Sequence, residues 1–108
     1  MTPTQQIQIV RQLVEDYCAR EMYLTHGFTP SDEEYQHILN IGESVLCTKW
    51  NVGYPGGGFV QAVVSNNLQL AYNRADYINR KYLQLYVGLM QSIGCPKEFS
   101  ELESSLMD

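Results

Sequence analysis

The chain has few of the residues and motifs on which enzyme catalysis usually depends. It contains only two histidines, and neither has a neighbouring Cys, Ser or Asp in a recognisable catalytic arrangement. There is no G-x-S-x-G or H-E-x-x-H motif, and no lysine follows the glycines as in a phosphate-binding loop. The adjacent acids Glu33 and Glu34 lie where a helix is predicted to begin, so the helix dipole explains them better than acid–base catalysis does. We therefore expect a protein that is not an enzyme and uses no cofactor.

Cysteines and long apolar runs are also scarce. The three cysteines, Cys18, Cys47 and Cys95, are far apart and form no C-x-x-C pair, so we expect reduced thiols and no metal site. The long uncharged stretch over residues 51–73 is interrupted by Pro55 and glycines, which argues against a membrane span. The first residues lack the basic and then apolar order of a signal peptide. These absences predict a cytoplasmic protein.

The net charge of −5 is unevenly distributed. Residues 1–48 carry seven acids and two bases, residues 49–97 carry five bases and one acid, and the last eleven residues carry four acids. The overall sign argues against direct nucleic-acid binding, because contacts to phosphate supply most of that affinity. The basic middle segment leaves room for a small anionic ligand, although solvated helix faces explain most of these charges equally well.

Apolar residues recur at helical spacing along most of the chain, which predicts an all-α, four-helix bundle-like single domain over residues 1–108. A strand at residues 59–64 is the minority alternative, because this segment is rich in valine. The segments are a helix over 2–26, a helix over 30–48, a Gly-rich loop over 49–58, a helix over 59–74, a helix over 76–93 and a short helix over 100–107.

Several residues have specific predicted roles in these helices. Thr2 is expected to cap the first helix, and either Thr29 or Ser31 the second. Gly42 lies on the buried stripe of the second helix, which indicates close helix–helix approach. Asn66 and Asn67 interrupt an apolar helix, so we expect one to be a buried amide bonded to a neighbouring helix and the other to be available to a ligand. Tyr82 and Tyr86 are assigned to the core.

The glycine run before the predicted third helix is the most informative segment. Glycines let backbone N–H groups converge, and a helix start adds partial positive charge, so this pattern is typical of an anion site. A tight turn would explain the glycines equally well. Arg74 is the best candidate to contact phosphate or carboxylate, whereas Asp76 is expected to cap the next helix and to pair with Arg74 or Arg80.

Aromatic rings near the same segments, at Trp50, Tyr54 and Tyr77, offer surfaces on which a nucleobase could stack. The candidate ligand-binding residues are Tyr54, Gly56, Gly57, Gly58, Phe59, Asn67, Arg74, Asn79 and Arg80.

Residues 55–79, about a quarter of the chain, resemble a family of small bacteriophage and prophage proteins. The segment runs from Pro55 and three glycines through F-V-Q-A-V-V-S-N-N-L to R-A-D-Y-I-N. The family pattern is roughly P-G-G-F-[LV]-x-A-V-L-x-N-D-L-x-x-A-x-x-R-A-D-x-x-N. This chain departs from it by an extra glycine and by Asn67 where the family has an acid. The resemblance implies a phage origin, and hence a location in the cytoplasm of the host bacterial cell, but no specific activity.

Three functions are compatible with these observations. The first is a non-catalytic counter-defence protein, a homo-oligomer packed through the predicted third and fourth helices, that sequesters a small phosphorylated nucleotide signal. The second is an inhibitor of a host nuclease or CRISPR complex, of the anti-CRISPR or anti-restriction type, that acts through the acidic first two helices. The third is a phage structural or regulatory adaptor. The local basic charge, the glycines and the aromatics favour the first.

Overall fold

A computed structural model of the chain describes residues 2–21, 31–53, 55–97 and 99. All regular secondary structure in these ranges is helical, which confirms the predicted all-α, bundle-like fold and leaves no strand at residues 59–64. The helices are α1 (Pro3–Glu21), α2 (Asp32–Trp50), α3 (Gly58–Val64), α4 (Leu68–Arg74), α5 (Tyr77–Lys81) and α6 (Leu83–Ser92).

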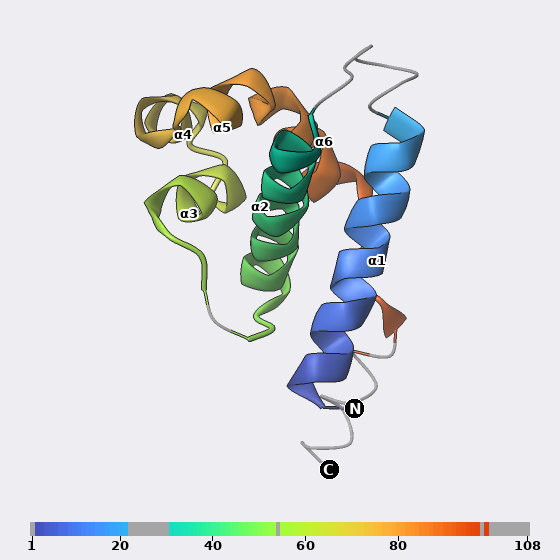
Figure 1. Cartoon of the computed structure of the whole chain (residues 1–108). Helices are drawn as coiled ribbons and strands as arrows, with labels where there is room; N and C mark the ends of the chain where they lie inside the picture. The colour runs from blue at the N-terminus through green and yellow to red at the C-terminus, as the bar shows by residue number, and fades with distance from the viewer. Residues whose placement is uncertain (1, 22–30, 54, 98, 100–108) are drawn as a thin grey trace.

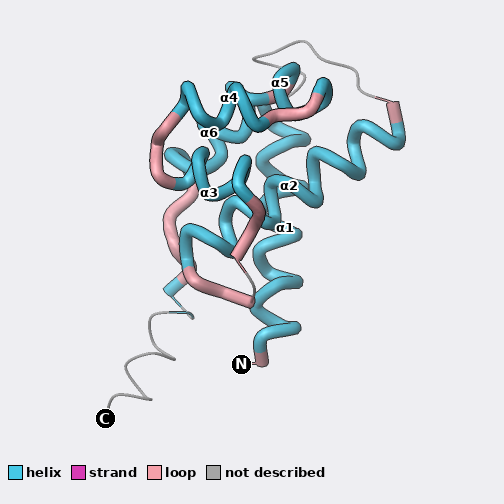
Figure 2. The backbone as a smooth tube through the Cα atoms, turned by 90° about the vertical axis from the view of Figure 1, so that its left-hand side faces the viewer, coloured by secondary structure: helices cyan, strands magenta, loops and turns pink. Residues whose placement is uncertain are grey.

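The helix α2 lies at the centre of the molecule. It contacts α1, α3, α5 and α6, and α1 runs antiparallel beside it (Figure 1). The helices α3 and α5 cover another side of α2, and α4 packs on α3 (Figures 1 and 2). The most deeply buried large side chains come from α1, α2, α3 and α6, and include Val14, Ile38, Leu46, Val63 and Tyr86.

Side chains of Thr2 and Ser31 cap the two long helices. Thr2 Oγ1 accepts a hydrogen bond from the backbone N–H of Gln5 at 3.2 Å, and Gln5 Oε1 accepts from the Thr2 N–H at 2.9 Å. This reciprocal pair is a capping box. At the start of α2, Ser31 Oγ accepts from the Glu34 N–H at 3.3 Å, so Ser31 is the cap rather than Thr29.

The predicted close approach at Gly42 is confirmed. A Cβ atom on Gly42 would lie only 2.7 Å from Val14 Cγ1 of α1 and 3.1 Å from Leu89 Cδ2 of α6. Three helices therefore meet at a position where only glycine fits, which explains why the sequence accepts a poor helix former inside α2.

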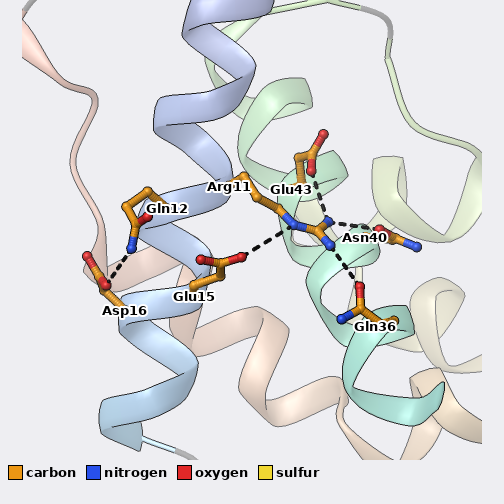
Figure 3. A network of polar contacts seen from close by, with 7 residues as sticks. All are labelled: Arg11, Gln12, Glu15, Asp16, Gln36, Asn40 and Glu43. Carbon is orange, nitrogen blue, oxygen red and sulfur yellow. Dashed lines mark hydrogen bonds and ion pairs between the residues drawn. The ribbon is translucent and has the colours of Figure 1, made fainter. Parts of the chain in front are cut away.

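Arg11 of α1 links the polar faces of α1 and α2 (Figure 3). Its Nη1 donates to Asn40 Oδ1 at 2.8 Å and to Glu43 Oε2 at 3.0 Å, and its Nη2 donates to Gln36 Oε1 at 3.2 Å. A second acid, Glu15 of α1 itself, lies farther away, at 3.9 Å from Nε. Arg11 therefore mainly bonds across the helix pair, and it neutralises part of the acidic face.

The predicted single helix over 59–74 is wrong, because the chain reverses between α3 and α4. Asn66 adopts a left-handed backbone conformation with φ of 62°. The N–H of Asn67 donates to the Ala62 carbonyl at 2.9 Å, and that of Asn66 donates to the Val63 carbonyl at 3.1 Å. These two bonds form a Schellman motif, which satisfies carbonyls at the end of a helix and prevents its continuation.

The roles predicted for the two asparagine amides are corrected as well. Both residues are exposed, so neither is the expected buried core amide. Asn67 instead caps α4, with its Oδ1 accepting from the Leu70 N–H at 3.2 Å. Asparagine tolerates left-handed backbone and also serves as an N-cap, so the Asn-Asn pair is a signal for ending one helix and starting another.

The predicted helix over 76–93 is divided into α5 and α6 at Tyr82, where φ is −110° and ψ is 16°. No proline or glycine lies at this point. The Tyr82 ring is buried, as predicted, and its hydroxyl donates to Glu34 Oε2 on α2 at 2.9 Å. A tertiary contact thus accompanies the interruption, and local sequence does not mark it.

The ends of the remaining segments differ by a few residues from the prediction. The helix α2 begins at Asp32 and extends to Trp50, where Asn51 in a left-handed conformation ends it. The irregular segment before α3 is therefore shorter than the predicted 49–58. The predicted end of the first helix and the predicted helix over 100–107 lie outside the described residues. In the part of the chain that the structure describes, no helix combines the length and hydropathy that crossing a membrane demands.

We predict that Gly42→Ala destabilises the fold by about 1–3 kcal/mol, because the added methyl overpacks the contact with Val14 and Leu89. Urea unfolding gives the free energy. Gly94→Ala is the matched control, since a Cβ at Gly94 has no neighbour within 4 Å. A Gly42→Ala protein at least as stable as this control would contradict the close packing.

Candidate functional site

The Arg74 side chain lies against the backbone of Gly58. Arg74 ends α4 and Gly58 begins α3, so the helical hairpin brings together residues sixteen positions apart. A methyl group at Gly58 would overlap Arg74 Nη1, and it would lie 3.2 Å from Cδ and 3.3 Å from Cζ. Arg74 and Gly58, both candidate ligand-binding residues, thus lie side by side in the structure.

Arg74 is exposed, and no acid among the described residues compensates its charge. No carboxylate among residues 2–21, 31–53, 55–97 and 99 lies within 4.0 Å of its nitrogens. Asp76, the expected partner, instead approaches His37, with 3.6 Å between Asp76 Oδ2 and His37 Nε2. The guanidinium therefore keeps its donors available to an outside acceptor.

The glycine turn is held in place by side chains but remains open to one side. The Gly56 N–H donates to Thr48 Oγ1 at 2.8 Å, and the Gly56 carbonyl accepts from Gln61 Nε2 at 2.8 Å. A Cβ at Gly56 would lie 2.5 Å from Ser44 Oγ, so glycine is required there. A Cβ at Gly57 would have no neighbour within 4 Å. Tyr54 lies outside the described residues.

The start of α3 contributes less than the sequence pattern suggested. Because the chain reverses after Val64, α3 has only seven residues. Its N-cap is Gly57, which has no side chain to bond the first N–H groups. Most attraction for an anion must therefore come from the full charge of Arg74 rather than from a long helix dipole.

Two predicted site residues lie in the core. Phe59 is 8% exposed and packs edge to face with Tyr86, at a ring separation of 5.9 Å. Asn79 is 5% exposed. Its Oδ1 accepts from Tyr86 Oη at 3.1 Å and lies 3.0 Å from His37 Nε2, which donates in this pair. Both side chains are thus committed to packing and to internal hydrogen bonds.

Asp76 caps α5, as predicted. Its Oδ1 accepts a hydrogen bond from the Asn79 N–H at 2.7 Å. The other oxygen faces His37, so Asp76, Asn79 and His37 form a polar cluster that joins α5 to α2. Burial, followed by the nearby charge of Asp76, raises the pKa of Tyr86, so this hydroxyl remains protonated beside the cluster. His37 lies 42 positions before Asn79, so no short-range spacing in the sequence predicts that it belongs to this cluster.

Arg80 lies on a second surface, formed by α4, α5 and the start of α6. Asn67 is exposed at the start of α4, which it caps, and it does not contact Arg74 in any described interaction. The Arg80 guanidinium stacks over the Tyr72 ring at 4.9 Å, and its Nε donates to the Tyr72 carbonyl at 3.2 Å. This surface holds an open groove of about 420 Å³. Its lining residues are Leu68, Tyr72, Arg80, Lys81, Leu83, Gln84 and Val87.

The aromatic residues considered for stacking differ in exposure. Trp50 is half-buried and packs edge to face against Phe99, with 6.1 Å between ring centroids. Tyr77 is 77% exposed. Tyr72, which sequence reasoning did not single out, is 53% exposed and stacks with Arg80. Among the described residues, accessible aromatic surface therefore lies mainly on α4 and α5.

The three cysteines are all reduced, as expected, but they differ in burial. Cys18 and Cys47 are buried, and burial raises the pKa of each thiol to about 11, so neither is a thiolate at neutral pH. Cys95 is exposed. The described residues contain no group of three or more His, Cys, Asp or Glu side chains placed to hold a metal ion.

We predict that Asn79→Ala destabilises the protein by about 1–3 kcal/mol, because the buried Tyr86 hydroxyl loses its acceptor. Urea unfolding followed by circular dichroism measures this change. Asn73→Ala, at an exposed position of α4, is the control and should change stability by less than about 0.5 kcal/mol. If the two variants are equally stable, the Asn79 side chain does not stabilise the fold through its hydrogen bond with Tyr86.

Comparison with known proteins adds no relative to this picture. Neither protein-family models, nor curated proteins, nor solved structures give a significant match to the chain. What the site does must therefore be argued from its own residues, chiefly the Arg74 guanidinium against the glycine turn.

Proposed function

We propose that this chain is a non-catalytic phage accessory protein that binds and sequesters a small phosphorylated nucleotide signal of bacterial defence. Arg74 would contact a phosphate, and the Gly56–Gly58 turn would let that phosphate approach the backbone. The observation that carries this proposal is the position of the Arg74 guanidinium, exposed beside Gly58 with no carboxylate of the described residues in reach.

The charges of the neighbourhood support an anionic ligand. Asp76, the acid nearest to Arg74 in the sequence, is engaged with His37 and leaves the Arg74 charge uncompensated among the described residues. A planar guanidinium with several donors binds phosphate oxygens in a bidentate manner, which a point charge does not do. The proposed ligand contacts are therefore Arg74, Gly57 and Gly58. Phe59 and Asn79 are left out because they are buried.

The phage origin comes from the resemblance of residues 55–79 to small phage proteins. The counter-defence role is inferred from that origin together with the small size and the acidity of the chain. A protein that only sequesters a signal needs affinity and no catalytic group, which fits a chain without a recognisable catalytic motif. In this proposal, an oligomer of the chain sequesters the nucleotide signal in the host cytoplasm.

A thermal-shift screen with cyclic and linear nucleotides tests the proposal. A ligand present at a hundred times its Kd adds about 2.7 kcal/mol of stability, so a binding nucleotide raises Tm measurably. We expect Arg74→Ala to abolish the shift, and Arg20→Ala, at an exposed arginine of α1, to retain it. The proposal fails if no nucleotide raises Tm, or if Arg74→Ala leaves the shift unchanged.

The glycines provide a matched pair of variants for the same screen. Gly58→Ala would displace the Arg74 guanidinium, whereas Gly57→Ala introduces a methyl into open space. We expect Gly58→Ala to weaken nucleotide binding far more than Gly57→Ala, as measured by titration calorimetry with the nucleotide found in the screen. Equal affinities would show that Arg74 does not act from its place beside Gly58.

The second candidate is an inhibitor that binds a basic host nuclease through the acidic helices. Asp32 and Glu33 favour it, because both are exposed in the first turn of α2. Glu34 is a poor probe, since it accepts from the Tyr82 hydroxyl and pairs with Lys81. We expect Asp32→Asn with Glu33→Gln to leave nucleotide binding intact. If this variant no longer captures a host nuclease and Arg74→Ala still captures it, the inhibitor is favoured.

A further inference from the structure

The groove on α4, α5 and α6 combines an apolar lining with a few hydrogen-bond donors. Its volume is about 420 Å³, within the range of sites that hold small molecules. The apolar part of the lining consists of Leu68, Tyr72, Leu83 and Val87. The polar part consists of Arg80, Lys81 and Gln84, all of which carry N–H donors. Such a lining suits a ligand with an apolar body and an anionic end.

The Arg80 guanidinium is held in place by two contacts to Tyr72. Its plane lies over the Tyr72 ring at 4.9 Å, and its Nε donates to the Tyr72 carbonyl at 3.2 Å. No carboxylate of the described residues lies within 4.0 Å of its nitrogens. The two terminal nitrogens therefore remain as donors, in the geometry that binds a planar carboxylate with two parallel hydrogen bonds.

The charge at the groove matches a single negative charge. Lys81 Nζ lies 3.6 Å from Glu34 Oε2, so this acid already compensates one of the two cations. Asp76, at the other end of α5, faces His37 instead. The described residues thus leave one uncompensated positive charge, that of Arg80. A carboxylate carries one negative charge at neutral pH, whereas a phosphate monoester carries about 1.5 to 2.

We propose that this groove binds a small carboxylic acid with an apolar body, such as a medium-chain fatty acid. The carboxylate meets the terminal nitrogens of Arg80, and the apolar body covers Leu68 and Leu83. Leu68 is 46% exposed without a ligand, and removal of this surface from water supplies the driving force. The inference does not rest on the proposed nucleotide function, which uses Arg74 and the glycine turn.

A second copy of the chain matches the groove less well. Two grooves that faced each other would bring Arg80 and Lys81 of both copies together, which like charges disfavour. The exposed acids Asp32 and Glu33 offer the opposite charge. However, the large apolar side chains that are strongly exposed among the described residues all lie on α4 and α5. No described face of the chain therefore combines acids with such side chains, as a small amphipathic acid does.

An NMR titration of the labelled full-length protein with octanoate tests the proposal. We expect octanoate to shift the backbone amide signals of the groove residues. Affinity should rise from hexanoate to octanoate to decanoate, by up to roughly fourfold for each methylene group that enters the groove. Octanamide, which has the same body and no charge, should bind more weakly than octanoate. Octyl phosphate should bind no more tightly than octanoate.

Variants at the two ends of the groove separate the charge from the apolar body. We expect Arg80→Gln to weaken octanoate binding about fivefold, as for a well-placed exposed ion pair. Leu68→Gln, at an exposed position, should weaken octanoate and octanamide alike. Arg20→Gln is the matched control, since Arg20 also lies over a tyrosine ring. This control and Arg74→Ala should bind octanoate like the wild type, even if the nucleotide proposal fails.

Glu34→Gln tests the charge balance directly, because it leaves Lys81 uncompensated while a glutamine oxygen still accepts from the Tyr82 hydroxyl. This variant should gain affinity for octyl phosphate relative to octanoate. The inference is overturned if octanoate shifts no groove amide, if the wild type prefers octyl phosphate, or if Arg80→Gln and Leu68→Gln both bind octanoate like the wild type. Groove signals that shift with protein concentration alone would identify a second copy as the occupant and would also overturn it.

Discussion

The missing side chain at Gly42 is the constraint on which the rest of the fold depends. Val14 of α1 and Leu89 of α6 both pack into the space that a Cβ would fill, so α2 can be approached closely from two sides. Protein interiors are close-packed, and a contact of this kind tolerates no added methyl without movement of the helices. The position of α6 against α2 in turn places Tyr82 and Tyr86. Their hydroxyls donate hydrogen bonds to Glu34 and Asn79, respectively.

The candidate site depends on a second feature, the reversal of the chain between α3 and α4. Without the Schellman motif at Asn66, a continuous helix would place Arg74 about 24 Å from Gly58 along its axis. The hairpin instead brings the guanidinium against the glycine backbone. Glycine at position 58 leaves the room that the arginine occupies, so the two residues are interdependent in a way that neither shows alone.

Polar residues of α5 divide between the interior and the surface. Asn79 faces inward and bonds to Tyr86 and His37, which fixes α5 against α2. Arg80, the next residue, faces outward and stacks on Tyr72 of α4. The same short helix thus holds the bundle together on one side and forms the edge of an exposed groove on the other.

The sequence by itself determined the helical class, the caps at Thr2 and Asp76, the close contact at Gly42, and the burial of Tyr82 and Tyr86. For the cap of α2 it left two candidates, Thr29 and Ser31. These features follow from local preferences and from helical periodicity, which act within a few residues. The Asn66 and Asn67 pair also held a readable signal for a helix break.

Only the tertiary structure decided that Phe59 and Asn79 are internal, that His37 rather than an arginine faces Asp76, and that Arg74 reaches Gly58. Each of these depends on which helix face meets which neighbour. That choice is made by the packing of the whole core, where residues such as His37 and Asn79 lie 42 positions apart. The periodicity of a single helix shows which residues share a face, but it does not show what that face will touch.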